Sequence, residues 1–407
     1  MAKLREYEKY VGSDVIDELE LYASKLSGVT IQNINSTAVG GGVAEILMRM
    51  IPMLHELGVN AMWDVIKGGE RFFEVTKKMH NALHGQKAAF TREELDLYVQ
   101  TNEMNAREMN LSGDIIFVHD PQPCALVDRR KDLGRKWIWR CHIDFSSPDP
   151  FTWNFLKEYI EEYDVAVFSA PSFARSLRIP QVLISPSIDP LSDKNRELSE
   201  EVIDSVLERF KIDKNRPIVT QISRFDYLKD PVGVVKVFHQ VRRQVDCQLV
   251  LAGGGATDDP EGAKVLAEVQ EIANNDPDVF LLLLPPASDI EINALQRASS
   301  VILQKSLREG FGLTVAEALW KAKPVIAGAV GGIPLQIVHK HSGLLTHTIE
   351  GTAFALRQLL QNPSFANALG ENGREHVRKN FLITRHLRDY LLLFLSLEHK
   401  GEDIVYL

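Results

Sequence analysis

Apolar runs alternate with amphipathic stretches along almost the whole chain. Strands that alternate with helices are typical of parallel sheets built from βαβ units, so the pattern predicts an α/β protein. In the first half, the runs that predict strands are 29–34, 115–118, 137–141, 165–168 and 182–184. In the second half, they are 218–223, 248–252, 279–284, 301–303 and 324–327.

Helical patterns lie between these runs. Residues 43–57 predict an amphipathic helix, and 198–210 a charged one. Residues 159–163 are expected to close another helix. The stretch 87–110 has no strand signal and is predicted to be an inserted helical region. A leucine-rich amphipathic helix is expected at 386–395.

A stretch rich in proline and serine, residues 185–192, lacks periodicity and predicts a break between two domains. The 407 residues are enough for two full cores. We expect a first Rossmann-like domain at 1–188, a second at 189–380 and a helical tail at 381–407. Packing of the tail on the first domain is one option for it. The alternative to two domains is a surface loop within one large domain.

Composition narrows the classes of function. Apolar residues make up 45% and charged residues 25%, as in ordinary soluble globular proteins. A formal charge of −9 argues against nucleic acid as the main partner. No apolar run is long enough to span a bilayer, and the charged start lacks a signal-peptide core. Three scattered cysteines (Cys124, Cys141 and Cys247) indicate a reducing compartment, so the cytoplasm is the expected location.

Residues 308–317, Arg-Glu-Gly-Phe-Gly-Leu-Thr-Val-Ala-Glu, are the most informative segment. They follow a predicted buried strand and open a helix. The two glycines let backbone amides approach a ligand closely at the start of the helix. Glu309 and Glu317 stand on either side of them. Amides suit the phosphates of a sugar nucleotide, and carboxylates suit its hydroxyl groups.

Other candidate residues also come directly after predicted strands. In open α/β sheets, ligands bind beyond the carboxyl ends of the strands. Two sheets whose strand ends face each other would form a cleft that both halves line. The candidates are Gly40, Gly41, Gly42, His119, Asp120, His142 and Asp144 in the first half, and Arg224, Gly253 and Glu309 in the second.

Several of these candidates have a structural interpretation as well. The glycines at 40–42 form either a phosphate loop or a flexible turn, and match neither a Walker loop nor the spaced dinucleotide fingerprint. Arg224 and Lys229 could hold phosphate oxygens with a fork and a point charge, or form a salt-bridged turn. The glycines at 253–255 favour a strand-exit turn.

The histidines leave two interpretations open. His119 and His142 follow apolar strands, where a hydrogen-bonded core residue is commoner than a catalytic one. His339, His341 and His347 lie in a polar stretch typical of a solvated loop. No spacing of cysteine, histidine or carboxylate residues predicts a metal site.

Together these residues resemble the GT-B retaining glycosyltransferases of family four, and the resemblance covers nearly the whole chain. Its most specific mark is a Glu-x7-Glu motif, formed by Glu309 and Glu317. Supporting marks are Gly-Gly-Val-Ala at 41–44, the cations Arg224 and Lys229, and Ala-Val-Gly-Gly-Ile-Pro at 329–334. Closer similarity to the glycosyltransferring trehalose synthases lies at 35–38, 118–123, 137–144 and 186–192.

The resemblance implies roles for particular residues. Arg224 and Lys229 would hold the diphosphate and neutralise the leaving group. His142 would hydrogen-bond the donor sugar near the reacting carbon. Glu309 would bind the glucose hydroxyls and Glu317 the ribose hydroxyls. The remaining substrate-binding residues would be Gly41, Gly42, Asp120, Asp144, Gly310, Phe311, Gly312, Leu313 and Thr314.

Such an enzyme moves glucose from UDP-, ADP- or GDP-glucose to free glucose with retention, and forms α,α-trehalose. Fixed cations and amides that stabilise the departing diphosphate would make a metal unnecessary, so no cofactor is expected. A same-face displacement is the expected path, and domain closure would exclude water. A homodimer is left open.

Two departures from the family pattern bear on the nucleotide side. The trehalose synthases carry Gly-Arg where this chain has Ala327 and Gly328, and an acidic turn is replaced at 339–342 by His-Lys-His-Ser. The nucleotide base is therefore left open. The alternatives are a sucrose-type synthase, a trehalose phosphorylase or a catalytically silent sensor of sugar nucleotides.

Overall fold

The computed structural model describes residues 3–38, 42–254 and 260–399. The chain divides into two compact units. The first runs to Pro186 and takes up the chain again from Ile383, and the second is Ser187–Leu382.

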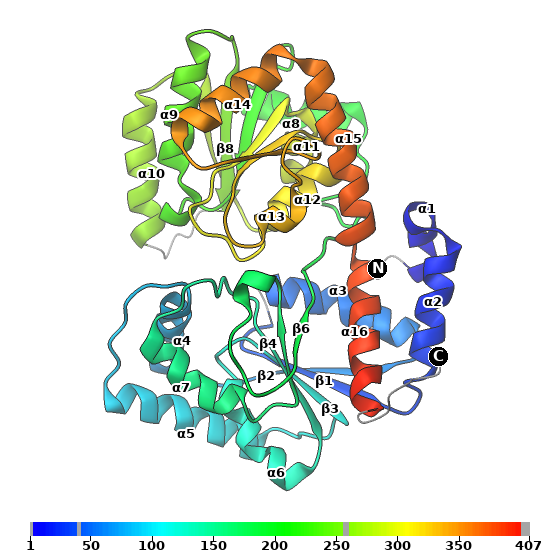
Figure 1. The fold of residues 1–407 in the computed structure, drawn as a ribbon. Coiled ribbons are helices and arrows are strands. Elements are labelled where there is room, and N and C mark those ends of the chain that lie inside the picture. Colours follow the sequence, from blue (N-terminus) through cyan, green and yellow to red (C-terminus); the bar gives the residue numbers. More distant parts are fainter. Residues whose placement is uncertain (1–2, 39–41, 255–259, 400–407) are drawn as a thin grey trace. The chain divides into compact units, whose positions relative to one another are not determined.

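The first unit contains a six-stranded parallel sheet in the order β2-β1-β3-β4-β5-β6 (Figure 1). Its strands are β1 (Thr30–Asn35), β2 (Asn60–Val65), β3 (Ile115–His119), β4 (Lys136–Arg140), β5 (Val165–Phe168) and β6 (Gln181–Leu183). Its helices are α1 (Glu8–Val11), α2 (Ser13–Ser24), α3 (Gly42–Glu56), α4 (Glu70–Leu83), α5 (Arg92–Glu108), α6 (Arg130–Leu133), α7 (Pro150–Ile160) and α16 (Ile383–Glu398).

Helix α16 packs on the first unit beside α2 and α3, as Figure 1 shows. Its aromatic residues meet the sheet at β3, where the ring of Phe117 lies 5.1 Å from that of Tyr390 and 5.9 Å from that of Phe394. The leucine-rich tail is therefore a layer of the first unit. Helices α4, α5 and α7 pack together elsewhere on this unit.

The second unit contains another six-stranded parallel sheet, in the order β12-β11-β10-β7-β8-β9. Its strands are β7 (Ile218–Ile222), β8 (Gln248–Gly254), β9 (Val279–Leu284), β10 (Val301–Gln304), β11 (Val325–Gly328) and β12 (Leu344–Thr346). Its helices are α8 (Glu200–Phe210), α9 (Pro231–Arg242), α10 (Pro260–Ala273), α11 (Asp289–Ala298), α12 (Leu313–Trp320), α13 (Ile333–Gln336), α14 (Ile349–Gln361) and α15 (Pro363–Asn380).

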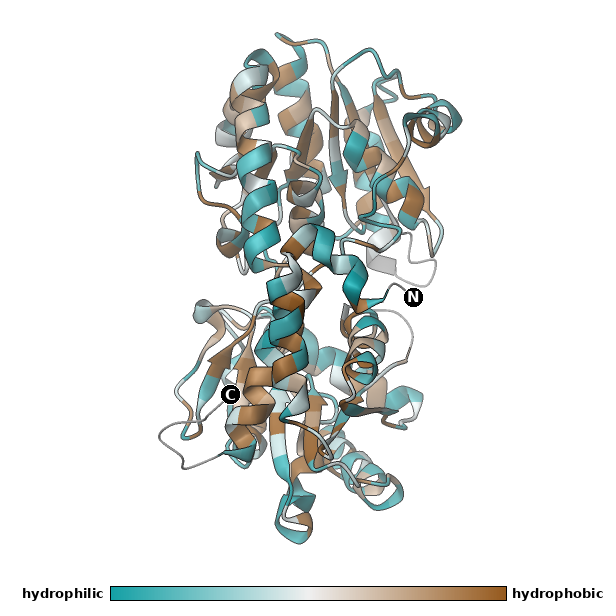
Figure 2. Cartoon of the chain, turned by 90° about the vertical axis from the view of Figure 1, so that its right-hand side faces the viewer, coloured by the Kyte–Doolittle hydropathy of each residue, from teal (hydrophilic) through white to brown (hydrophobic). Residues whose placement is uncertain are grey.

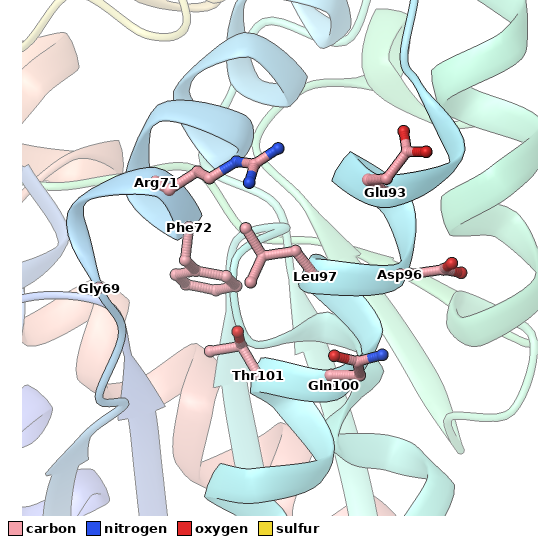
Figure 3. A pocket seen from close by; sticks show the side chains of 8 residues that line it. All are labelled: Gly69, Arg71, Phe72, Glu93, Asp96, Leu97, Gln100 and Thr101. Carbon is pink, nitrogen blue, oxygen red and sulfur yellow. The ribbon is translucent and has the colours of Figure 1, made fainter.

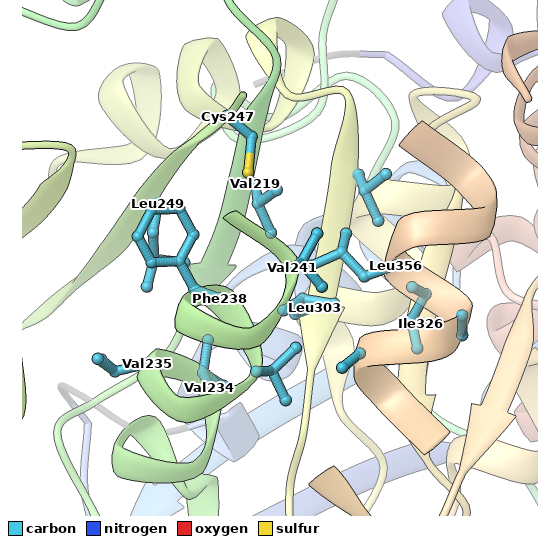
Figure 4. Close-up of a cluster of buried hydrophobic side chains, with 14 of the residues drawn as sticks. Val219, Val234, Val235, Phe238, Val241, Cys247, Leu249, Leu303, Ile326 and Leu356 are labelled. Carbon is cyan, nitrogen blue, oxygen red and sulfur yellow. The ribbon is translucent and has the colours of Figure 1, made fainter. Parts of the chain in front are cut away.

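Both faces of the second sheet are buried. Figure 4 shows Val219 and Leu303 of the sheet packed with Phe238 of α9 and Leu356 of α14. On the other face, α8 and α11 pack in a second cluster that includes Ile222. Strands buried on both faces read as continuous apolar runs, which explains why the sequence predicts the other strands of this sheet but not the short edge strand β12. In Figure 2 the strands are mostly hydrophobic, while the helices carry both kinds of residue.

Every predicted strand is present, with its ends shifted by two residues or fewer. Two strands, β2 and β12, are not among those predicted from the sequence. Strand β2 lies at an edge of its sheet and contains Asp64, which accepts a hydrogen bond of 2.7 Å from Gln32 Nε2. Strand β12 is an edge strand of three residues, too short to show a period.

Among the residues described, no helix combines the length and apolar character that crossing a bilayer requires.

A close approach of backbone explains Gly253 in β8. A Cβ built there would lie 1.9 Å from the carbonyl oxygen of Ser223, whereas one at Gly254 would meet nothing within 4 Å. We expect Gly253→Ala to destabilise the protein by about 1–3 kcal/mol, because the backbone must move to make room. Thermal unfolding checks this, with Gly254→Ala as the matched control. Equal unfolding midpoints for the two variants would contradict the prediction.

Candidate active site

The first unit brings polar side chains together where its strands end. Asn33 of β1 is level with Phe117 of β3, and His119 of β3 is level with Arg140 of β4. His142 follows β4, and its Nε2 lies 3.1 Å from Nδ1 of His119. Nε2 of His119 lies 3.1 Å from Oδ1 of Asn33. The two predicted histidines are therefore in direct contact.

Sequence reasoning missed Asn33. The available signal was a buried strand, Thr30–Asn35, with polar side chains at three of the five positions after the first residue. Gln32, Asn33 and Asn35 are all buried, and buried polar groups need partners. A polar residue inside an apolar strand is thus a sign of a polar network.

Both contacting histidines are neutral near pH 7. Burial lowers the pKa of His119 to about 3 and holds the pKa of His142 well below its usual value. The buried cation of Arg140 acts on both pKa values in the same direction. The pair can therefore exchange hydrogen bonds with a ligand without carrying charge.

Asp120 occupies a tight turn just past β3. Its φ of 66° lies in the left-handed region, which Asp tolerates better than most residues. Its Oδ1 accepts a hydrogen bond of 2.8 Å from the backbone N–H of His142. Its carbonyl oxygen accepts one of 3.0 Å from Trp139 Nε1. Burial raises the pKa of Asp120 to about 7, although the His142 N–H and the Arg140 charge act in the opposite direction.

The other predicted residues of the first unit are less informative. Asp144 is buried, and its Oδ1 accepts a hydrogen bond of 2.9 Å from the backbone N–H of Ser146, so it caps the turn after β4. Gly42 is the first residue of α3. Gly40 and Gly41 lie outside the described residues.

In the second unit, an ion pair joins the segments that follow the carboxyl ends of the neighbouring strands β7 and β10. Nζ of Lys229 lies 2.6 Å from Oε2 of Glu309, and Ser306 Oγ donates to the same oxygen at 3.1 Å. The two side chains are only 18% and 11% exposed. Arg224 follows β7, and its side chain is 65% exposed and pairs with Asp226 at 3.1 Å. The structure thus unites Lys229 and Glu309 and leaves most of Arg224 open to a ligand.

Glycines shape the backbone around Glu309. Gly312 precedes α12 with a φ of 84°. A Cβ at Gly331 would lie 1.5 Å from the carbonyl oxygen of Glu309, so any side chain would displace the loop. The backbone N–H of Gly332 donates to the carbonyl oxygen of Gly310 at 3.1 Å. Two glycine-containing loops therefore run in contact at this point.

The rest of the predicted donor segment is anchored to the second unit. The ring of Phe311 lies 5.4 Å from that of Phe381, and Leu313 begins α12. Thr314 Oγ1 donates to Gln304 Oε1 at 3.1 Å. The hydroxyl of Thr314 therefore has a structural role besides any contact with a ligand.

Glu317 lies deeper than the other predicted residues, with 5% of its surface exposed. Lys321, the residue after α12, donates to the carbonyl oxygen of Glu317 at 3.1 Å and to Asn195 Oδ1 at 3.0 Å. Burial lowers the pKa of Lys321 to about 7, which the charge of Glu317 partly opposes. The ribose contact of Glu317 stays a prediction.

The two departures from the family pattern occupy different settings. Gly328 ends β11, and a Cβ there would lie 2.4 Å from the carbonyl oxygen of Ser306. His339 is exposed, and its Nδ1 accepts a hydrogen bond of 3.0 Å from the backbone N–H of Leu345. Within the part of the chain that the structure describes, no three histidine, cysteine or carboxylate residues are grouped as metal ligands would be.

A pocket of about 410 Å³ lies between α4 and α5 of the first unit. Figure 3 shows the side chains of Phe72 and Leu97 close together in it. It contains none of the predicted site residues. The pocket is lined by Gly69, Arg71, Phe72, Glu93, Asp96, Leu97, Gln100 and Thr101.

Comparisons with known proteins bear on both units. Residues 33–175 match the family described as the N-terminal domain of trehalose synthase, and residues 203–376 match group 1 of the glycosyl transferases. The chain is 43% identical to a trehalose synthase of Rubrobacter xylanophilus over 403 residues, which cover 97% of each chain. A trehalose phosphorylase of Pleurotus pulmonarius is 29% identical, and the match covers 92% of this chain and 58% of that protein.

Among solved structures, a sucrose-phosphate synthase from Thermosynechococcus elongatus superposes with a TM-score of 0.72 at 18% identity. The match covers 92% of this chain and all of that one (100%). Two parallel six-stranded sheets with such a match show the GT-B fold. The match to group 1 of the glycosyl transferases and the 43% identity to a trehalose synthase show that the chain is a hexosyltransferase. The full-length identity goes further: the chain belongs to the trehalose synthase family.

The raised pKa of Asp120 makes the stability of the protein depend on pH. The folded protein keeps this proton up to about pH 7, whereas an unperturbed carboxyl releases it near 3.8. The contribution of Asp120 to the free energy of unfolding therefore falls as pH rises through this window. Between about pH 5 and about pH 8, the free energy of unfolding of the native protein should therefore fall relative to that of Asp120→Asn. We expect this relative change to be roughly 2 kcal/mol, because one pKa unit corresponds to about 1.4 kcal/mol.

Thermal unfolding of both proteins at the two pH values measures this difference. Asn keeps the oxygen that accepts from His142 and tolerates the left-handed backbone. Parallel pH dependence in the two proteins would show that Asp120 does not titrate in this range.

Proposed function

We propose that the chain transfers glucose from a nucleoside diphosphate glucose to free glucose, with retention, to form α,α-trehalose. The observation that carries the proposal is the Lys229–Glu309 pair at 2.6 Å beside the exposed Arg224. Membership of the trehalose synthase family, with 43% identity over 97% of the chain to a trehalose synthase, supports the choice of sugars.

The charges of this site suit departure of a diphosphate. Negative charge grows on the diphosphate as its bond to glucose breaks, and fixed cations stabilise that state more than the ground state. Arg224 offers a planar fork, and Lys229 a point charge that Glu309 holds in place. The proposed chemistry is a same-face displacement, with the departing diphosphate stabilised by the two cations.

Glu309 has the position of a hydroxyl-binding group in this proposal. Lys229 and Ser306 both bind its Oε2, which leaves Oε1 for the hydroxyls of the donor glucose. A carboxylate already paired with a cation is a poor nucleophile, because attack would leave Lys229 without its partner. Retention by a covalent intermediate on Glu309 is therefore disfavoured.

We propose that no metal takes part, since Arg224 and Lys229 supply the positive charge that the leaving group needs. UDP-, ADP- and GDP-glucose all remain candidate donors, and a homodimer remains open. The cytoplasm stays a prediction from the three cysteines, which are all free thiols.

Two other functions are alternatives to this proposal. A trehalose phosphorylase would use inorganic phosphate, and the more distant match to the Pleurotus pulmonarius protein is its support. A sensor that binds sugar nucleotides without turnover would keep the same cations. Release of nucleoside diphosphate only in the presence of free glucose separates the transferase from both.

Product analysis with a panel of nucleotide glucoses and free sugars tests the proposal. We expect trehalose from one or more of the three donors with glucose as acceptor, at the same rate in excess EDTA. Sucrose or a glucan as product, or phosphate-dependent release of glucose 1-phosphate from trehalose, would contradict the trehalose-forming assignment. Loss of activity in EDTA would contradict the metal-independent mechanism alone.

We expect Glu309→Ala to lower turnover by two or more orders of magnitude, because it removes a donor contact and leaves Lys229 without its partner. Steady-state kinetics measures the loss, and circular dichroism confirms the fold. Glu309→Gln is the matched variant, since it keeps the shape and removes the charge. Near-normal turnover of Glu309→Ala would exclude Glu309 from the mechanism.

We expect Arg224→Ala to weaken binding of nucleoside diphosphate by roughly 1.5–3 kcal/mol, the range of a hydrogen bond to a charged group. Calorimetry with UDP, ADP and GDP measures the change. Arg243→Ala is the matched control, because Arg243 is an exposed arginine just after α9, at the end that leads into β8. Equal affinity in both variants would remove Arg224 from the diphosphate site.

A further inference from the structure

A chain of three side chains crosses the first unit from β1 to the residue just beyond β4. Oδ1 of Asn33 lies 3.1 Å from Nε2 of His119, and Nδ1 of His119 lies 3.1 Å from Nε2 of His142. Asn33 is 3% exposed and His119 1% exposed, so water does not compete for these contacts. Each contact needs one donor and one acceptor. The positions of the protons in this series of side chains therefore follow from the side chain whose donor and acceptor are already fixed.

The fixed end is the amide of Asn33. Its Nδ2 donates to the backbone carbonyl oxygen of Met62 in the neighbouring strand β2, at 3.3 Å. A flipped amide would turn its oxygen toward that carbonyl and set two acceptors against each other. Oδ1 of Asn33 therefore faces His119 and can only accept.

The protons of both histidines follow. Since Oδ1 of Asn33 accepts, Nε2 of His119 carries the hydrogen. In a neutral imidazole the other nitrogen is then an acceptor, so Nδ1 of His119 accepts from Nε2 of His142. Nε2 of His142 thus carries the hydrogen, and its Nδ1 has a free lone pair.

This assignment of the ring protons requires both imidazoles to be neutral, and the groups around them favour the neutral form. The charged and titratable groups that act on the two rings are Arg140 of β4 and His386 of α16, and Asp120 of the β3 turn accepts from the backbone N–H of His142. Arg140 and His386 both act to lower the pKa of His142, as does burial. A second positive charge here would be placed beside the buried guanidinium of Arg140.

We infer that Asn33, acting through His119, fixes the tautomer of His142 so that Nδ1 of His142 presents a lone pair to the substrate. Asn33 is thus a positioning residue, and the group that His142 recognises must be a hydrogen-bond donor. Among the described residues, none makes a hydrogen bond to Nδ1 of His142, and the residue is partly exposed. On the proposed function, that donor is a sugar hydroxyl rather than a ring or phosphate oxygen.

The first test is independent of activity. In protein labelled with ¹⁵N at histidine, the long-range nitrogen–proton spectrum distinguishes a protonated from an unprotonated ring nitrogen. We expect His119 and His142 both to carry their hydrogen on Nε2 in the native protein. Single His119→Gln and His142→Gln variants assign the signals. A hydrogen on Nδ1 of His142 in the native protein overturns the inference.

Two variants of Asn33 test its role. Asn33→Leu removes the acceptor with little change in volume, so we expect both tautomers of His142 to appear. Asn33→Asp keeps an acceptor oxygen toward His119, so the native tautomer should be retained. Asn35→Leu is the matched control, because Asn35 is equally buried on β1 and its amide bonds Thr37 and Trp63 instead. A single native tautomer in Asn33→Leu would overturn the role of Asn33, whether or not the variant is active.

The second test concerns the substrate and rests on the proposed function. In a series of deoxy and deoxyfluoro donor glucoses, fluorine keeps an acceptor and removes the O–H donor. At the hydroxyl that meets His142, we expect fluorine and hydrogen to reduce kcat/KM equally, by about tenfold, since one hydrogen bond is lost. In His142→Ala, donors with a hydroxyl, a hydrogen or a fluorine at that position should have similar kcat/KM values.

The outcomes separate the two proposals. If fluorine is tolerated better than hydrogen at that position, and this preference disappears in His142→Ala, His142 donates and the inference fails. If no nucleotide glucose is turned over at all, the proposed function fails, while the tautomer measured by NMR still decides the role of Asn33.

Discussion

The contact between Lys229 and Glu309 is the interaction on which the candidate site of the second unit depends. It joins the short 3₁₀ helix Tyr227–Lys229, which follows β7, to the loop after β10. Strands β7 and β10 are neighbours in the sheet. The backbone N–H of Leu307 also donates to the carbonyl oxygen of Leu228 at 2.7 Å, so the two loops are held at backbone and side-chain level. Removing one partner of a mostly buried ion pair destabilises the protein, because the other charge is left buried without a partner. The local fold therefore depends on the same two charges as the site.

The same pair decides how charge is available there. Glu309 neutralises Lys229 in the absence of substrate, while Arg224 remains largely exposed and pairs with Asp226. A diphosphate would meet one open guanidinium and one lysine that has to be shared with Glu309. On the proposed function, binding and positioning of the diphosphate would be separate tasks of the two cations, so their substitution should affect affinity and turnover differently.

The first unit has a different electrostatic character. Its histidines are neutral because burial and the cation of Arg140 disfavour further positive charge. Asp120 is close to half-protonated near neutral pH for the same reason of burial. The two imidazoles therefore offer hydrogen bonds of defined direction without a charge of their own, which suits uncharged hydroxyl groups.

The sequence by itself determined the elements and most of the candidate residues. Apolar runs identified the strands because both faces of a parallel sheet are buried. The spacing of Glu309 and Glu317 pointed to the segment that we propose binds the donor. The strand β2 remained hidden because an edge strand with a polar residue lacks the apolar run.

Only the tertiary structure decided which side chains meet. Asn33 and His119 are 86 residues apart, and Lys229 and Glu309 are 80 apart, so no local pattern shows either contact. These pairs exist because strand order places β1 beside β3 and β7 beside β10. Strand order is set by long-range packing of the helices on both faces of the sheet. Because a hydrogen bond is directional, the positions of the protons follow only once the neighbouring side chains are known.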